Sequence, residues 1–99
     1  MRPWSKLGYD RDRIALYMMR VEAFSTAESE FRRAIWLNPF EWRFKYHLAW
    51  CLFRQKKYKE SRELTDGILR VRPDEPCCLE LLPKIEAGLR QGKHANGQT

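Results

Sequence analysis

The chain has 99 residues, a mass of 12.0 kDa and a formal net charge of +6. This length allows one domain and excludes the larger cofactor-binding folds. Hydrophobic residues make up 43% and charged residues 32% of the sequence, which is typical of a globular domain and excludes a disordered chain. The basic surplus permits an acidic partner but also serves solubility, so by itself it identifies no ligand.

The sequence predicts neither a membrane-spanning helix nor a secretory leader. No apolar run approaches the roughly 18 residues that such a helix needs. Charged residues from Arg2 to Arg20 interrupt the first twenty positions and leave no room for the apolar region of a signal peptide. The three cysteines, Cys51, Cys77 and Cys78, form no disulfide framework. We therefore expect a cytoplasmic protein with no membrane partner.

Apolar residues recur with helical spacing, and residues typical of helix ends divide the pattern into five segments. Asp10 is expected to cap the first helix, and Ser25 with Glu28 forms a capping box at the second. Pro39 suits the first position of the third helix. Short connections make neighbouring helices pack antiparallel, which predicts an all-α fold. The expected helices cover about 10–22, 25–38, 39–55, 58–71 and 75–91, and residues 92–99 form a flexible tail.

The first predicted helix pair recurs in the second at an offset of 34 residues. Matching pairs are Ile14 with Leu48, Ala15 with Ala49, Phe24 with Tyr58, Ala27 with Ser61 and Pro39 with Pro73. A helix pair that repeats with this period is typical of the tetratricopeptide repeat, or TPR. The sequence resembles that family at positions of its motif, which here hold Ala27, Phe31, Ala34, Pro39, Leu48, Ala49, Tyr58 and Pro73.

This resemblance implies antiparallel helix pairs stacked in a short right-handed superhelix. Unit one would span 8–41 and unit two 42–75, followed by a capping helix over 76–91, and an N-terminal arm over 1–7 would precede them. The sequence departs from the family where Arg11 and Lys45 replace its tryptophan. Pro83 lies inside the capping helix and predicts a kink there. We expect this helix to pack on the fourth through Leu79, Leu82 and Ile85.

An excess of aromatic residues in the third helix is the most informative feature for function. In TPR arrays the first helix of each unit lines a concave groove. Trp42, Tyr46, Trp50 and Phe53 are expected to form one stripe on that face. Aromatic and arginine side chains are enriched at binding hot spots, so we expect a peptide or helix of a partner protein to bind there. The predicted binding residues are Tyr9, Arg13, Leu16, Met19, Arg20, Trp42, Arg43, Tyr46, Trp50, Phe53 and Arg54.

Two other occupants of the groove stay open. The N-terminal arm, with Trp4, Leu7 and Tyr9, could cover the stripe, or two chains could bury it in a homodimer. The protein would then be an assembly or dimerisation module. Arg43-Phe44 and the segment from Ala49 to Leu52 also resemble the TPR chaperones of type III secretion, which suggests a secretion-type chaperone with a self-occupied groove.

The sequence predicts no enzyme, cofactor or metal. His47 and His94 have no neighbouring residues that suggest a catalytic triad. His47 and Cys51 share a helical face but supply only two of the four ligands of a structural zinc site. The basic run from Arg54 to Lys59 suits a helix C-terminus, so we expect no nucleic-acid partner. Gly67 costs its helix about 1 kcal/mol relative to alanine, and it would let another backbone approach closely.

Overall fold

The computed structural model describes residues 7–97, with side chains to residue 92. Within these residues the chain forms five α-helices and no strand, which confirms the all-α fold class. The predicted bounds of the fourth helix agree with the structure, and those of the first three differ by at most three residues at either end. The helices are α1 (Tyr9–Arg20), α2 (Phe24–Leu37), α3 (Trp42–Arg54), α4 (Tyr58–Val71) and α5 (Pro76–Gly97).

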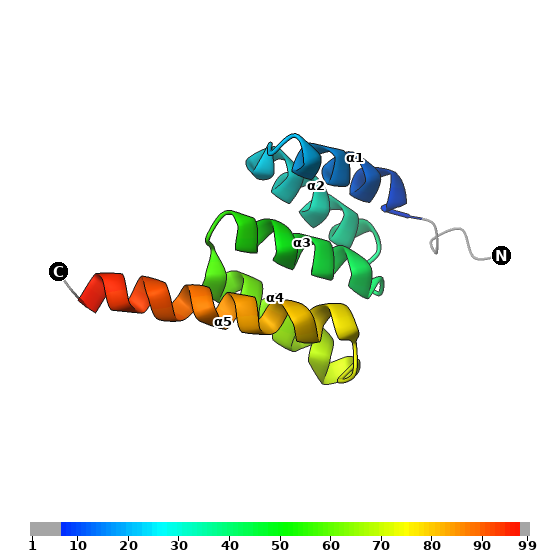
Figure 1. The fold of residues 1–99 in the computed structure, drawn as a ribbon. Helices are drawn as coiled ribbons and strands as arrows, with labels where there is room; N and C mark the ends of the chain where they lie inside the picture. Colours follow the sequence, from blue (N-terminus) through cyan, green and yellow to red (C-terminus); the bar gives the residue numbers. More distant parts are fainter. Residues whose placement is uncertain (1–6, 98–99) are drawn as a thin grey trace.

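Neighbouring helices pack in antiparallel pairs, as in a helical repeat. Helix α1 pairs with α2, α3 pairs with α4, and α2 lies against α3 to join the two pairs (Figure 1). Helix α5 follows α4 and packs against it. As a result α1, α3 and α5 form one layer, with α2 and α4 behind it (Figure 1). No helix within residues 7–97 combines the length and apolar character that crossing a lipid bilayer requires.

The core consists of two clusters on either side of α3. The first joins both helix pairs and contains Ala15, Ala27, Phe31, Leu48, Cys51 and Leu52. The second joins α3 to α5 and contains Ala49, Leu81 and Ile85. Because Ala15 and Ala49 are fully buried, their small side chains let the two helices of each pair approach closely. Helix α3 therefore lies in the middle of the stack and carries most of the packing.

The structure corrects three predicted helix starts. Gly8, not Asp10, precedes α1; it has a φ of 87°, and a Cβ there would lie 2.8 Å from the Ala34 carbonyl oxygen. This left-handed backbone and close approach require glycine. Ala23 precedes α2, so the Ser25 capping box does not form. Pro39 lies in a turn, and the Glu41 side chain caps α3 by accepting a hydrogen bond from the Arg43 backbone N–H at 3.1 Å.

Helix α5 also differs from its prediction. It does not end near residue 91 but continues to Gly97, and Pro83 lies inside it, as the sequence places it. Leu79 does not pack on α4, because it is 49% exposed while Leu81 and Ile85 point into the core. A Cβ at Gly88 would lie 2.4 Å from the Tyr58 ring. This glycine thus allows α5 to lie directly on the start of α4.

Candidate functional site

Three aromatic side chains of α3 from the predicted groove face α5. Tyr46, Trp50 and Phe53 are half-buried and pack against the core cluster that includes Leu81 and Ile85. The Trp50 and Phe53 rings stack with their centroids 5.5 Å apart. The capping helix therefore covers one side of the aromatic stripe, an occupant that the sequence analysis did not consider. Trp50 stays partly open, as the groove hypothesis requires.

The open part of this surface is shallow. Between α3 and α5 lies a hollow of about 80 Å³, far smaller than the roughly 300–1,000 Å³ of small-molecule pockets. The Lys84 ammonium nitrogen lies 5.6 Å from the centroid of the Trp50 ring, close enough for a cation–π contact. Burial raises the pKa of Tyr46, which keeps its phenol neutral. The hollow is lined by Tyr46, Trp50, Cys77, Glu80, Leu81 and Lys84.

Helix α1 contributes the other predicted residues. Leu16 is 38% exposed, and Arg13 and Arg20 are exposed. Met19 instead packs against the first core cluster. Tyr9 donates its hydroxyl proton to Glu41, and this hydrogen bond raises the pKa of Tyr9.

A second polar contact also joins α1 to α3. His47 Nδ1 lies 2.7 Å from a carboxylate oxygen of buried Asp12. Together with the hydrogen bond between Tyr9 and Glu41, this contact ties the two helices whose faces form the predicted groove. We use the name concave-side surface for the exposed parts of Leu16, Tyr46 and Trp50 with Arg13 and Arg20, which the sequence analysis expects in one groove.

The structure separates Trp42 from the stripe. Trp42 faces α4, and the Arg72 guanidinium lies 4.8 Å from its ring centroid. Each residue of an α-helix advances about 100°, so Trp42 and Trp50 lie about 80° apart around α3. At this angle the two rings meet different neighbours, because Trp42 contacts α4 and Trp50 lies beside α5. The prediction that Trp42 lines the same groove as Tyr46 and Trp50 is wrong.

Two predicted arginines are also held by local contacts. The Arg43 guanidinium lies 5.6 Å from the centroid of Trp42 and pairs with Glu41 at 3.4 Å. The Arg54 guanidinium lies 5.0 Å from the centroid of Phe24. Arg54 therefore reaches toward α2, away from the aromatic side chains of α3.

A larger apolar pocket, which the sequence did not predict, lies between α3 and α4, and we name it the α3–α4 pocket. Its volume is about 460 Å³. Val71, on its wall, is 82% exposed, and a Cβ built on Gly67 would meet no atom within 4 Å. Gly67, which was expected to let another backbone approach, was the one sequence signal for this space, and no backbone within residues 7–97 approaches it. The lining residues are Pro39, Phe40, Trp42, Lys45, Glu63, Leu64, Gly67, Ile68, Val71 and Arg72.

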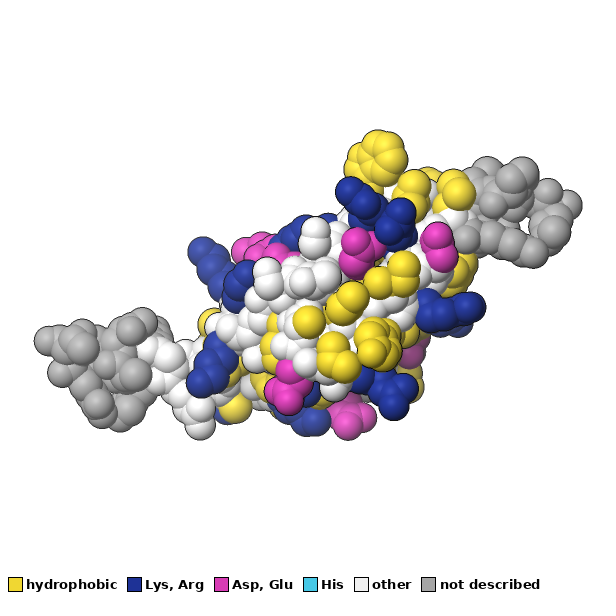
Figure 2. Space-filling model, turned by 90° about the horizontal axis from the view of Figure 1, so that it is seen from above, with side chains coloured by type: hydrophobic (Ala, Val, Ile, Leu, Met, Phe, Trp, Pro, Cys, Tyr) yellow, Lys and Arg dark blue, Asp and Glu magenta, His cyan; other side chains and the backbone are white. Residues whose placement is uncertain are grey.

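Apolar side chains are also exposed on α1, at the end of the stack. Seen from above, hydrophobic side chains gather on this face between charged ones (Figure 2). Ile14 is 41%, Tyr17 61% and Val21 54% exposed. These residues leave α1 with an apolar face that no helix within residues 7–97 covers.

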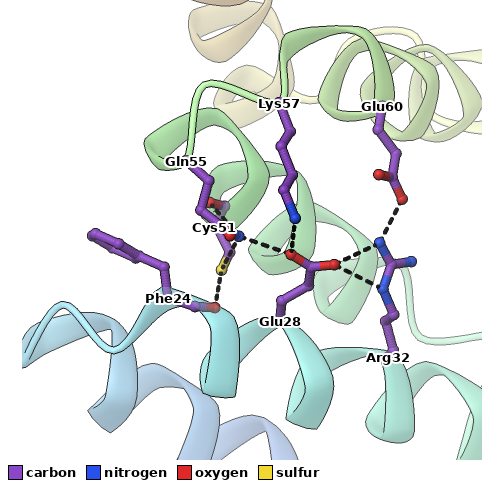
Figure 3. A network of polar contacts seen from close by, with 7 residues as sticks. All are labelled: Phe24, Glu28, Arg32, Cys51, Gln55, Lys57 and Glu60. Carbon is purple, nitrogen blue, oxygen red and sulfur yellow. Dashed lines mark hydrogen bonds and ion pairs between the residues drawn. The ribbon is translucent and has the colours of Figure 1, made fainter.

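A polar network on the other edge holds the two helix pairs together (Figure 3). Glu28 on α2 accepts hydrogen bonds from Gln55 at 2.8 Å and Lys57 at 3.0 Å, and from Arg32, which also pairs with Glu60. Partial burial raises the pKa of Glu28, but the hydrogen bonds from Gln55, Lys57 and Arg32 outweigh it and hold the pKa below its usual range. Glu28 thus joins the helix pairs and does not cap α2.

The cysteines have the properties of structural residues. Cys51 is buried, and its thiol donates to the Phe24 carbonyl oxygen at 3.3 Å (Figure 3). Burial raises the pKa of Cys51 to about 11 and that of Cys78 to about 12. Both thiols are therefore protonated near neutral pH, whereas a nucleophilic cysteine needs the thiolate. Across the described part of the chain, no three His, Cys, Asp or Glu side chains come together as metal ligands would.

Comparison with known proteins gives no significant match to a family model, a curated protein or a solved structure.

Proposed function

We propose that this chain is a TPR-like interaction module that binds a peptide or helix of a partner protein on its concave-side surface. The observation that carries the proposal is the half-open position of Tyr46 and Trp50 on α3, which is tied to α1, where Arg13 and Arg20 are exposed. Aromatic and arginine side chains supply much of the energy at protein interfaces, because they bury large areas and also make polar contacts. The proposal includes no catalytic step, cofactor or metal.

The shape of the surface suggests how a ligand would bind. A hollow of about 80 Å³ cannot enclose a small molecule, so the ligand would lie across α1 and α3 as an extended or helical segment. Its apolar side chains would cover Leu16 and the open edge of Trp50. Arg13 and Arg20 form no ion pair within residues 7–97, so they favour a ligand with carboxylates or free carbonyl groups.

Capture from a lysate of the source organism tests this function. The chain should retain a defined protein, and Arg20→Glu should lose it while unfolding at the same temperature, because Arg20 is exposed. Trp50→Ala should also lose it, but this side chain packs on α5 and its loss can lower stability. Trp36→Ala is the matched control, because Trp36 lies on α2 and is 81% exposed. Equal retention by all four proteins would contradict the proposal.

The alternative is an assembly module, and the exposed apolar face of α1 supports it. Ile14, Tyr17 and Val21 would be buried between two copies of the chain. Sedimentation equilibrium should then show a mass that rises with concentration, and Tyr17→Glu should return it to that of one chain. A single-chain mass at all concentrations would exclude this alternative.

A further inference from the structure

The α3–α4 pocket presents exposed apolar surface that is not part of the concave-side surface. It combines the indole of Trp42 and the side chain of Val71 with an open floor at Gly67. Since a Cβ at Gly67 would meet no atom of the described fold, packing between helices does not require glycine there. Because Gly67 has no side chain, the floor of the pocket stays free for a group from another segment. Exposed apolar patches of this kind mark sites that another chain segment covers.

The chain enters the fold beside the connection between α2 and α3, which borders this pocket. At Gly8 the backbone is so near the start of α3 that a Cβ would lie 2.8 Å from a ring carbon of Phe44. Tyr9 then bonds to Glu41, which belongs to the same connection as Pro39 and Phe40 at the edge of the pocket. The N-terminus of α1 therefore lies beside the connection that forms one side of the pocket.

The segment that precedes this point has a suitable length and composition. Residues 1–6 have the sequence MRPWSK and lie outside the described residues. Trp4 is three residues from Leu7, a distance of roughly 10 Å in an extended chain, so its side chain can reach across the 38–41 connection. Trp4 is its large apolar side chain, and Arg2 and Lys6 are basic. Glu63 lies at the pocket and has no ion-pair partner within residues 7–97.

We propose that residues 1–6 fold back into the α3–α4 pocket and that Trp4 fills the space over Gly67 beside Trp42. An indole ring would bury apolar area against Val71 and Ile68, and Arg72 would lie near two tryptophan rings instead of one. Glu63 would face the basic residues on either side of Trp4. A short tether gives a roughly millimolar effective concentration, so a modest contact is enough to hold the segment.

This site differs from the occupant expected from the sequence, which was the concave groove. Helix α5 already packs on Tyr46, Trp50 and Phe53, whereas the space over Gly67 is open. The proposal does not depend on the proposed function, because the two surfaces share no residue. It assigns Gly67 and Trp42 a common role as floor and wall of an intramolecular docking site.

Nuclear magnetic resonance of the full chain tests the contact. Trp4→Ala should shift the Trp42 indole resonance and the methyl resonances of Ile68 and Val71, and in the unchanged protein the Trp4 ring should show nuclear Overhauser effects to these methyl groups. Trp36→Ala, which removes an exposed indole elsewhere, should leave the Ile68 and Val71 methyl resonances in place. These effects should not change with protein concentration.

A second pair of variants separates docking from a general effect on the fold. Gly67→Leu fills the pocket, and Gly92→Leu adds the same side chain to α5 at a position that is equally open. Both chains should fold, but only Gly67→Leu should move the Trp4 indole resonance to its position in unfolded peptide.

Three results would overturn the proposal. The first is a Trp4→Ala variant that shifts Trp50 and Leu16 and leaves Trp42 in place, which would put the segment on the concave-side surface. The second is the absence of any shift in either region. The third is a contact that weakens on dilution, which would mean that the segment comes from a second copy.

Discussion

The two helix pairs follow the same sequence pattern but differ in how deeply their first helices are buried. Ile14 of α1 is 41% exposed, while Leu48, at the equivalent position of α3, is 2% exposed. Tyr17 is 61% exposed, and its equivalent Cys51 is fully buried. Helix α3 has α2 on one side and α4 and α5 on the other, whereas α1 lies at the end of the stack. Burial therefore depends on position in the stack more than on the repeat pattern.

The second helices of the two pairs differ in another way. Two equivalent positions are equally buried, but they hold apolar residues in α2 and polar residues in α4. Ala27 and Phe31 of α2 correspond to Ser61 and Thr65 of α4, and all four are fully buried. Ser61 donates to the Ala49 carbonyl oxygen at 2.6 Å, and Thr65 donates to Ser61 at 2.9 Å. Polar residues are tolerated in these apolar positions because their hydroxyl groups are hydrogen-bonded.

Removing α5 should have the largest effect on stability, because α5 covers the second helix pair and, within residues 7–97, nothing equivalent covers α1. A chain that ends at Pro73 exposes Ala49, Leu64 and the aromatic stripe, so we expect loss of cooperative unfolding, followed by aggregation. A chain that ends at Gly92 keeps the residues that pack on α4 and should unfold like the full chain. Calorimetry measures both, and a sharp transition in the shorter chain would show that α5 is not a cap.

Shortening equivalent side chains of α1 and α3 tests directly whether their burial sets their contribution to stability. Leu48→Ala should lower the free energy of unfolding by about 2–5 kcal/mol, because it leaves a cavity in the first core cluster. Ile14→Ala should cost less than about 1 kcal/mol, because its side chain is already half in water. Urea denaturation gives both values. Equal losses would mean that another chain covers the face of α1.

The contact between α5 and α4 depends on Gly88, and α1 has no equivalent of it. Gly88→Ala should lower the free energy of unfolding by about 1–3 kcal/mol, because the new methyl group overlaps the Tyr58 ring. Gly92→Ala meets no neighbour, so it should be neutral or add up to about 1 kcal/mol through helix propensity. A stabilised Gly88→Ala chain in urea denaturation would argue against close packing of α5.

The polar network around Glu28 joins the two helix pairs, and its contribution to the free energy of unfolding should depend on pH. Since the folded pKa of Glu28 lies below its ordinary value of 4.5, its contribution is fully present above that pH. It is lost as the pH falls through the folded pKa. Glu28→Gln should therefore lower stability by about 1 kcal/mol at pH 7 and by less near pH 3. If Glu28→Gln lowers the free energy of unfolding by the same amount at pH 7 and pH 3, Glu28 is not ionised in the folded protein.

The sequence by itself determined the helices and their pairing. The 34-residue period places Ala15, Ala27, Phe31 and Ala34 at buried positions, because small and aromatic residues at helical spacing have one face to bury. Helix α4 begins at Tyr58 and ends at Val71, as its pattern predicts. The sequence predicted the helix starts less accurately, because Gly8 and Glu41 contact residues far along the chain.

Only the tertiary structure decided which aromatic residues form one surface. A spacing of four residues drifts around the helix, so the docking of α4 and α5 places Trp42 in one environment and Trp50 in another. The docking of α5 depends in turn on Gly88 at Tyr58, a contact between side-chain shapes that no local pattern encodes. The α3–α4 pocket arises in the same way, where Gly67 and the 38–41 connection meet from distant parts of the sequence.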